Sequence, residues 1–302
     1  MSMKALVTGA TGLVGRELLR RVERAVVLTR DVAESERRLG SGVKAWPWQP
    51  SQEPAPAAAF DGVDVVFHLA GEPVAAGRWN EERKQRIRDS RVLGTRHLVS
   101  ALSTAAALPR VLVCASGIDF YGDRGDTELR EGMPKGQGFL SDVVEAWEAE
   151  ARAAESFGVR VVMMRFGLVL AARGGALEKM LPPFKLGIGG KLGDGRQWLP
   201  WVHLDDAVGL LLHAARDERL RGPINVVAPE AVTNAEFTRA LGQALGRPAV
   251  LPVPRLALRV VFGELSQALL DSRRAIPGVA LETHYGFAYP RLAPALAACV
   301  RG

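Results

Sequence analysis

Short apolar runs alternate with longer segments of helical periodicity along the first half of the chain. After residue 12, apolar residues recur at Leu13, Leu18, Leu19 and Val22, which predicts a helix with one buried face. Longer helical patterns cover Glu81–Leu102 and Phe139–Ser156. The runs between helices are typical of strands buried in a parallel sheet. The predicted strands are Lys4–Thr8, Ala25–Thr29, Val43–Trp46, Val63–Leu69, Arg110–Cys114, Val159–Phe166 and Ile224–Val227.

This alternation predicts an α/β fold built on a doubly wound parallel Rossmann sheet. After Phe166 the pattern changes, because the segment 174–195 is rich in glycine and proline, as ligand-binding loops often are. Thr233, followed by Glu236 three residues later, predicts the start of a helix. We therefore expect a Rossmann domain that consists of residues 1–170 and also includes 203–228. Residues 171–202 and 229–302 are expected to form a smaller C-terminal substrate lobe.

Glycines 9, 12 and 15 lie where the first strand meets the first helix. Glycine there permits a tight turn, lets a pyrophosphate approach the backbone and lets the helix pack close to the strand. The N-terminus of the helix offers free N–H groups and the positive end of its dipole. Glycines also mark ordinary turns, so the prediction depends on the surrounding order of strand, turn, helix and strand. That order is present, and it predicts a dinucleotide cofactor.

The second strand ends in Thr29-Arg30-Asp31, where the adenosine ribose lies in a βαβ unit. A basic residue at this point accepts the 2′-phosphate of NADP, whereas an acid binds the ribose hydroxyls of NAD. Arg30 favours NADP, and Asp31 keeps NAD as the alternative. The residues expected to bind the cofactor are Gly9, Thr11, Gly12, Leu13, Val14, Gly15, Thr29, Arg30, Leu69, Ala70 and Gly71.

Composition narrows the class of protein. The 302 residues are 48% apolar and 24% charged, which is typical of a globular chain rather than a disordered one. The net charge of +6 permits anionic ligands, but the basic residues are scattered and do not predict nucleic-acid binding. Cys114 and Cys299 cannot build a disulfide framework, and no Cys/His cluster has metal-ligand spacing. We expect a cytoplasmic protein without a membrane partner, since neither a signal peptide nor a membrane-length apolar run is present.

Several motifs, taken together, resemble a known family over nearly the whole chain. They are Thr8–Gly15, Leu28–Arg30, His68–Pro73, Ser90-Arg91, Gly94-Thr95, Phe120–Gly122, Gly189–Gly193, Gly195–Trp198, Trp201–His203, Gly263-Glu264 and Gly286-Phe287. The chain is similar to extended short-chain dehydrogenases/reductases, in particular to an atypical epimerase-family branch of nucleoside-diphosphate-sugar-epimerase-like proteins with an extra C-terminal segment. The resemblance implies a nucleotide cofactor and allows a homodimer through the two long helices.

The usual chemistry of that superfamily needs a Tyr acid/base, a Lys four residues later that lowers its pKa, a Ser and an Asn. Matched by position, Leu140 and Val144 stand where the Tyr and Lys would be. Gly117 takes the Ser position, with Ser116 one residue early, and Arg91 replaces the Asn. Because all four are lost together, the resemblance predicts a different mechanism or none.

Other residues offer substitutes. Tyr121 lies just past the carboxyl end of a strand and could donate a proton, while Ser116 could hold a substrate oxygen. The structural alternative makes Tyr121 an aromatic anchor of its loop and lets Ser116 tie down its own turn. Asp119 is a weaker candidate. The expected substrate contacts are Glu72, Arg91, Arg196 and Trp198. The structural alternative is a helix cap or solvated loop for Glu72, a surface ion pair for Arg91 and core packing for Trp198.

The sequence thus predicts an NADP-dependent oxidoreductase or epimerase that acts on a polar, anionic small molecule, with a nucleotide sugar as one candidate. Tyr121 and Ser116 would replace the missing Tyr-Lys pair. The alternative function is a non-catalytic NADP-binding regulatory module whose cofactor state governs a protein contact.

Overall fold

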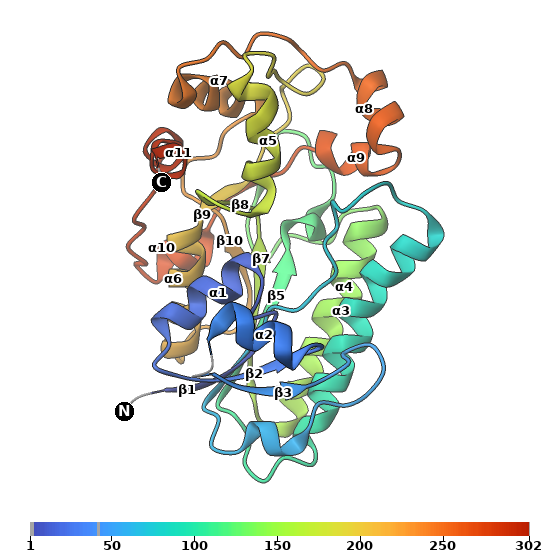
Figure 1. The fold of residues 1–302 in the computed structure, drawn as a ribbon, viewed down its shortest axis with the longest axis vertical. Coiled ribbons are helices and arrows are strands. Elements are labelled where there is room, and N and C mark those ends of the chain that lie inside the picture. The colour runs from blue at the N-terminus through green and yellow to red at the C-terminus, as the bar shows by residue number, and fades with distance from the viewer. Residues whose placement is uncertain (1–2, 41–42, 302) are drawn as a thin grey trace.

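A seven-stranded parallel sheet forms the centre of the molecule (Figure 1). The computed structural model describes residues 3–40 and 43–301. The strands of the sheet are β1 Lys4–Thr8, β2 Arg24–Thr29, β3 Lys44–Pro47, β4 Val65–His68, β5 Val111–Gly117, β7 Arg160–Phe166 and β10 Gly222–Val226. Their spatial order is β10-β7-β5-β4-β1-β2-β3, so the chain winds outward from β1 and then, in the opposite direction, from β4. The prediction of a doubly wound parallel sheet is confirmed.

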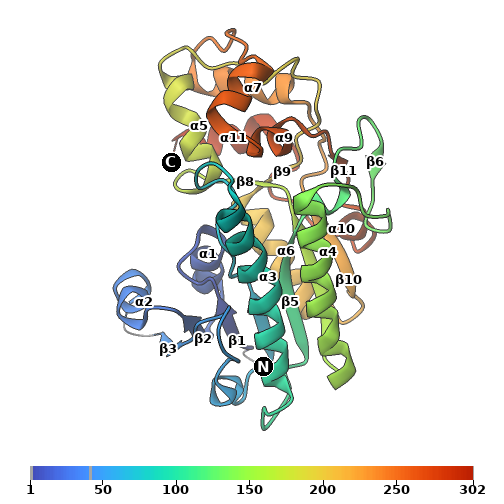
Figure 2. The same cartoon turned by 90° about the vertical axis from the view of Figure 1, so that its right-hand side faces the viewer.

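Helices cover both faces of this sheet. One face carries α1 (Leu13–Arg21) and α6 (Leu204–Arg216), and the other carries α3 (Glu81–Leu102) and α4 (Phe139–Arg152), which run side by side (Figure 2). The shorter elements around the sheet are α2 Val32–Leu39, η1 Ala57–Phe60, η2 Ile118–Tyr121 and η3 Ala153–Phe157.

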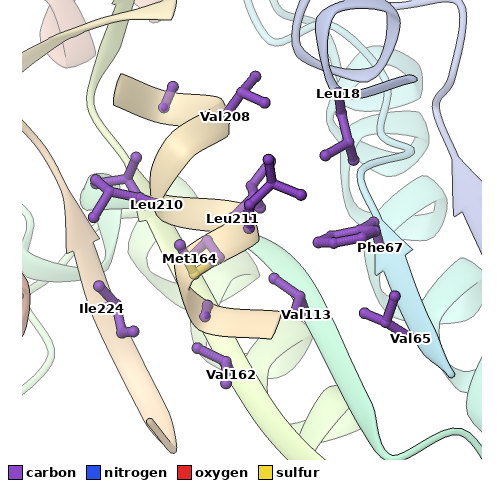
Figure 3. Close-up of a cluster of buried hydrophobic side chains, with 14 of the residues drawn as sticks. Leu18, Val65, Phe67, Val113, Val162, Met164, Val208, Leu210, Leu211 and Ile224 are labelled. Carbon is purple, nitrogen blue, oxygen red and sulfur yellow. The ribbon is translucent and has the colours of Figure 1, made fainter. Parts of the chain in front are cut away.

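The core beneath α1 and α6 is formed by side chains from helices and strands together. Leu18 and Leu211 meet Phe67, Val113 and Met164, all fully or almost fully buried (Figure 3). Burying one such side chain stabilises the fold by about 1.5–3 kcal/mol. This packing holds the strands rigidly, and therefore also the loops that follow them.

A smaller body stands beyond one end of the sheet, at the top of Figure 1. Its helices α5 (Gly175–Lys185), α7 (Asn234–Leu245) and α11 (Leu292–Arg301) share a separate buried cluster around Trp201 and Phe237. The remaining elements are the paired strands β8 Leu168–Leu170 and β9 Trp201–His203, the paired strands β6 Glu128–Leu129 and β11 Arg274–Ala275, and helices α8 Arg255–Phe262, α9 Leu265–Leu270 and α10 Gly278–Glu282.

The segment after residue 277 returns from this lobe to the Rossmann core. Ala280 is buried in the same cluster as the α6 side chains, and Tyr285 packs against that cluster. The Asp206 carboxylate accepts the N–H groups of Ala288 and Tyr289 at 2.7 and 2.8 Å. The C-terminal region is therefore anchored at two places.

Two helices of the lobe show what local sequence signals can and cannot predict. Thr233 and Glu236 form the predicted capping box at the start of α7. Helix α5 was not predicted, because Pro182 and Pro183 lie inside it. They fall in its last turns, where the missing N–H groups remove two hydrogen bonds without preventing the preceding turns. Within residues 3–40 and 43–301, no helix has the length and apolar character needed to cross a membrane.

Candidate nucleotide cleft and adjoining cavity

The turn between β1 and α1 needs glycine for two separate reasons. Gly9 has φ +67°, and a Cβ there would lie 2.6 Å from the carbonyl oxygen of Leu69. A Cβ at Gly15 would lie 2.3 Å from the carbonyl oxygen of Gly9, so this glycine permits close packing of the helix on the turn. Gly12 is the N-cap of α1 and uses no side chain to cap it. The first N–H groups of α1 are thus left open toward the end of the sheet.

A chain of hydrogen bonds fixes the neighbouring β4 loop. Thr8 Oγ1 accepts the N–H groups of Leu69 and Ala70, each at 3.1 Å. Its own proton therefore goes to Nδ1 of His68, 2.8 Å away, which leaves Nε2 to donate to Thr95 Oγ1 at 3.0 Å. Burial lowers the pKa of His68 to about 4, so the ring is neutral.

Together these loops enclose a cleft of about 260 Å³. Of the predicted cofactor residues, it is lined by Gly9, Thr11, Gly12, Thr29, Arg30, Leu69, Ala70 and Gly71. Leu13, Val14 and Gly15 lie behind it in the first turn of α1 and do not line it. Sequence reasoning missed Trp48 and Pro50 on the opposite wall, because they follow the predicted strand Val43–Trp46 and no local motif marks them as ligand contacts.

The two charges at the end of β2 have different surroundings. Asp31 is the N-cap of α2, and its Oδ1 accepts the N–H of Glu34 at 2.9 Å. Arg30 lines the cleft and is exposed, and no described residue forms an ion pair with it. A free cation therefore stands where a ribose phosphate would lie, while the neighbouring carboxylate is used by the backbone.

Arg91 lies partly buried beside the β4 loop. Its Nη1 donates to the carbonyl oxygens of Glu72 and Ile87 at 3.0 and 3.1 Å. Its guanidinium carbon is 5.2 Å from the centre of the Trp147 ring. Burial lowers the pKa of Arg91 to about 10, against the opposing charges of Asp119 and Glu72. Arg91 is therefore the internal cation between the cleft and the cavity described next.

Glu72, the other residue predicted at this edge, has a different partner. Its Oε1 accepts a hydrogen bond from Arg83 Nη1 at 2.6 Å, as part of an ion pair that is largely buried on the arginine side. Glu72 lines the cleft, and its carboxylate is used in this ion pair rather than as a helix cap.

A cavity of about 780 Å³ lies between the loops after β5, the start of α4 and helix α9. Its lining residues are Trp79, Asp119, Gly122, Asp123, Arg124, Lys135, Gly136, Gln137, Gly138, Phe139, Leu140, Ser141, Glu264, Gln267, Ala268, Asp271 and Arg273. The chain from 122 to 141 and the segment 264–273 thus form facing walls. This is the carboxyl edge of the sheet, where open α/β folds bind ligands.

Asp119 occupies the most informative position on that wall. A Cβ on Gly117 would lie 3.3 Å from Asp119 Oδ2 and 3.5 Å from Cγ2 of Val144. Arg273 Nη2 approaches Asp119 Oδ1 at 3.2 Å. A carboxylate therefore lies beside Gly117, with one arginine paired to it and the charge of Arg91 nearby. Sequence reasoning gave Asp119 little weight, because no spacing signal places Arg273 next to it.

Tyr121 and Ser116 point into the protein interior. Tyr121 is fully buried, its hydroxyl accepts from Arg165 Nη1 at 2.9 Å, and it lies 2.9 Å from Asn225 Oδ1. Ser116 is 5% exposed and donates to Glu148 Oε1 at 2.6 Å. Burial raises the pKa of Tyr121. These contacts argue against the predicted role of the two hydroxyls in transferring a substrate proton, because neither hydroxyl lines the cavity.

Arg196 and Trp198 lie outside both hollows. Arg196 is exposed, and neither residue lines the cleft or the cavity. The Trp198 indole donates to Asp126, and Arg274 lies over its ring at 4.8 Å. These contacts tie the lobe to the β5–β6 connection and argue against direct substrate binding. No group of three or more His, Cys, Asp or Glu side chains suited to a metal occurs in the part of the chain that the structure describes.

Comparison with known proteins places this arrangement in a family. Residues 5–227 match the model of the NAD dependent epimerase/dehydratase family, and 253–299 match a domain of unknown function, DUF1731. The chain belongs to the NAD dependent epimerase/dehydratase family. The first match covers the whole sheet, and the second covers α8 to α11 apart from the last residues, so the family and its C-terminal extension agree with the predicted resemblance.

Relatives within the family align over almost the full length. The epimerase family protein SDR39U1 of Mus musculus is 38% identical over 301 residues, covering 97% of this chain and 98% of that protein. The epimerase family protein Mb2239 of Mycobacterium bovis is 36% identical, covering 96% of this chain and 95% of its own. The crystal structure of human SDR39U1 (isoform 2) with NADPH superposes with a TM-score of 0.87 at 34% identity, covering 99% of both chains.

Proposed function

We propose that this protein is an NADP(H)-dependent oxidoreductase or epimerase that acts on a polar, anionic small molecule, a nucleotide sugar being one candidate. The observation that carries the proposal is the charge pattern at the end of β2, where Arg30 is free in the cleft while Asp31 caps α2. Arginine at this point suits a 2′-phosphate. The related human SDR39U1, crystallised with NADPH, supports the same choice.

The residues present fit a dinucleotide. The Gly9–Gly12 turn keeps the backbone open where a Cβ would collide, and α1 directs its unbonded N–H groups to the same place. Thr29 and Arg30 would hold the adenosine ribose and its 2′-phosphate. Leu69 to Gly71 would contact the part of the dinucleotide that connects this ribose to the nicotinamide. When bound, NADP⁺ or NADPH accepts or supplies a hydride.

For the substrate we propose a place in the cavity beside Gly117. The Asp119 carboxylate is positioned to accept the proton of a substrate hydroxyl as its carbon is oxidised, and to return that proton on reduction. Arg273, which also donates to Asp271 Oδ2 at 2.7 Å, holds its charge 3.2 Å from Asp119 Oδ1, and the charge of Arg91 favours an anionic substrate. In this proposal Asp119 takes the role first assigned to Tyr121. Leu140 on the cavity wall and Val144 beside Gly117 support the loss of the usual Tyr-Lys pair.

The test of the cofactor proposal is a calorimetric titration of the protein with NADPH and NADH at one ionic strength. Arg30→Ala is expected to weaken NADPH binding by about 1–3 kcal/mol, the range for a charged hydrogen bond, and to leave NADH binding nearly unchanged. Arg38→Ala is the matched control, since Arg38 lies nearby on α2 but pairs with Glu34. Equal losses for both cofactors would place the 2′-phosphate elsewhere.

The test of the proton-transfer proposal is turnover, with UDP-glucuronic acid and simple hydroxy acids as probes and products separated by chromatography. Asp119→Asn is expected to lower kcat about 10²–10⁴-fold while NADPH affinity stays within twofold, as for loss of an acid/base group. Asp61→Asn, an exposed carboxylate that lines neither the cleft nor the cavity, is the control expected to retain turnover. An Asp119→Asn enzyme as active as the parent would refute the assignment.

One observation favours the second candidate function, a non-catalytic NADP-binding module. The Tyr121 and Ser116 hydroxyls are both committed to buried partners, and Val144 presents a methyl group beside Gly117. A module of this kind would bind NADPH with the Arg30 dependence described above and convert none of the probes.

A further inference from the structure

The end of the lobe farthest from β3, at the top of Figures 1 and 2, separates charge in an unusual way. The segments 180–193 and 237–263 contain six basic residues and no Asp or Glu. The basic residues are Lys185, Lys191, Arg239, Arg247, Arg255 and Arg259. Acids border these segments at Glu178, Asp194, Glu236 and Glu264, so the acid-free part of the lobe lies between them.

The two segments lie against each other. Leu192 and Val253 form an isolated parallel β-bridge. The N–H of Val253 donates to the carbonyl oxygen of Lys191 at 2.8 Å, and the N–H of Gly193 donates to the carbonyl oxygen of Val253 at 2.9 Å. Gly190 faces the carbonyl oxygen of Leu251 so closely that no Cβ would fit between them. The two segments are thus joined where 190–193 meets 251–253, and we call the exposed residues of both segments the distal face.

The same face exposes large apolar side chains. Leu256 on α8 is 73% exposed, Val260 65% and Val261 58%, and on the adjoining segments Leu186 and Val250 are each 74% exposed. Soluble domains seldom leave such side chains together in solvent without a partner. With 100° per residue, Leu256, Val260 and Val261 project from one side of α8, and Arg255 and Arg259 lie along the edge of that side. Only Leu258 of this helix is buried.

A hollow beside α7 adds a cationic recess to this face. It measures about 570 Å³, and its lining includes Lys191, Arg239 and Arg247 but no acid. None of these three forms an ion pair with any residue in the described ranges. On the distal face the one carboxylate found paired with these cations is Asp194, 3.3 Å from Arg255. Asp194 and Glu236 lie within Coulombic range of Lys191 and Arg239, so the charge of the recess is compensated in part, while its lining itself offers a phosphate three cations and no acid.

We propose that the distal face binds peripherally to an anionic lipid surface, with the apolar side of α8 entering the headgroup region and the surrounding cations contacting lipid phosphates. Exposed apolar residues edged by arginine and lysine are the two elements of interfacial binding. A second copy of the chain is a poorer occupant, since it would bring six further cations against the first six. This departs from the expectation of no membrane partner, and it requires no membrane-spanning helix.

The experiment is flotation of the full-length protein with vesicles of phosphatidylcholine alone and with about one third phosphatidylglycerol. Binding is expected only to the anionic vesicles and is expected to weaken as salt is raised. Arg255→Glu/Arg259→Glu should weaken it more than about 25-fold, since each basic residue contributes about fivefold. Val260→Gln/Val261→Gln should also weaken it, and both variants should retain the parent's NADPH affinity and melting temperature.

Leu108→Gln is the matched control, because Leu108 is also exposed, at 43%, but lies outside the distal face. It is expected to bind vesicles like the parent. Failure of the protein to float with anionic vesicles would overturn the proposal, as would equal losses in the Leu108 variant. Sedimentation of the unmodified protein as a dimer that Val260→Gln/Val261→Gln dissociates, without vesicle binding, would instead identify a second copy as the occupant.

Discussion

His68 links the candidate cofactor cleft to the stability of the whole chain. It is fully buried, hydrogen-bonded by both ring nitrogens, and neutral because burial lowers its pKa to about 4 from an ordinary value near 6.5. Between these two values the unfolded chain binds a proton that the folded protein does not bind. Stability contributed by the neutral ring is therefore complete above pH 6.5 and is lost as the pH falls toward 4.

We predict that this single histidine removes about 3 kcal/mol of the free energy of unfolding between pH 7 and pH 4, from a difference of about 2.5 pKa units. Chemical denaturation at a series of pH values measures it. Burial also lowers the pKa values of His203 and His213, so part of the acid loss will remain without His68. His68→Gln should flatten the profile more than His213→Gln, and indistinguishable slopes would contradict the assignment.

Tyr121 shows why single side chains are harder to assign than backbone turns. Its place after β5 was predicted correctly, and a phenol at that edge of the sheet suggests proton transfer. The direction of the side chain depends on Arg165 and Asn225, which follow it by 44 and 104 residues. No pattern within the local sequence reports such partners. Asp119, two residues earlier, was undervalued for the same reason, since its partner Arg273 is distant in sequence.

Elements governed by local rules could be predicted well. Helix α3 begins and ends as predicted, at Glu81 and Leu102, because Asn80 caps it and its buried positions follow the helical period. Helix α4 ends earlier than predicted, at Arg152, and continues as the tighter turn η3. The apolar pattern does not distinguish an α-helix from a 3-10 turn, since the last turn of a helix often tightens without changing which side is apolar.

The same reasoning explains what was missed in the lobe. The position of its helices depends on contacts such as that of Gly190 with Leu251, where a Cβ would lie 1.5 Å from the carbonyl oxygen. From the sequence alone, a glycine that is required by such a close contact cannot be distinguished from a glycine in a flexible loop. The segment 174–195 was therefore interpreted as loop, although α5 occupies part of it.

Across the molecule, one buried network joins the sheet, α4 and the C-terminal region. Arg165 on β7 donates to both carboxylate oxygens of Glu148 on α4, each at 2.8 Å, and these side chains are 2% and 1% exposed. Through Tyr121 the network reaches Asn225, whose amide donates to the carbonyl oxygen of Ile276 at 2.9 Å. It lies beneath the cavity wall and holds together the segments that form it.

We predict that Glu148→Gln lowers the free energy of unfolding by about 3–5 kcal/mol, because it leaves the Arg165 guanidinium buried without a counter-charge. Glu145→Gln is the matched control on the same helix. Its side chain is 56% exposed and pairs with Lys135, so its replacement should cost no more than about 1 kcal/mol. Urea denaturation of the two variants measures the difference.

Replacing both partners separates the cost of an unpaired charge from the value of the pair. Glu148→Leu with Arg165→Met removes both charges and keeps much of the volume, so it should be more stable than Glu148→Gln. If the double variant is instead the less stable of the two, the bonds from Arg165 to Tyr121 and to the carbonyl oxygen of Glu131 outweigh the charge. The network would then act chiefly by positioning the 118–131 segment, and NADPH affinity should survive in every variant that folds, because no member of the network lines the cleft.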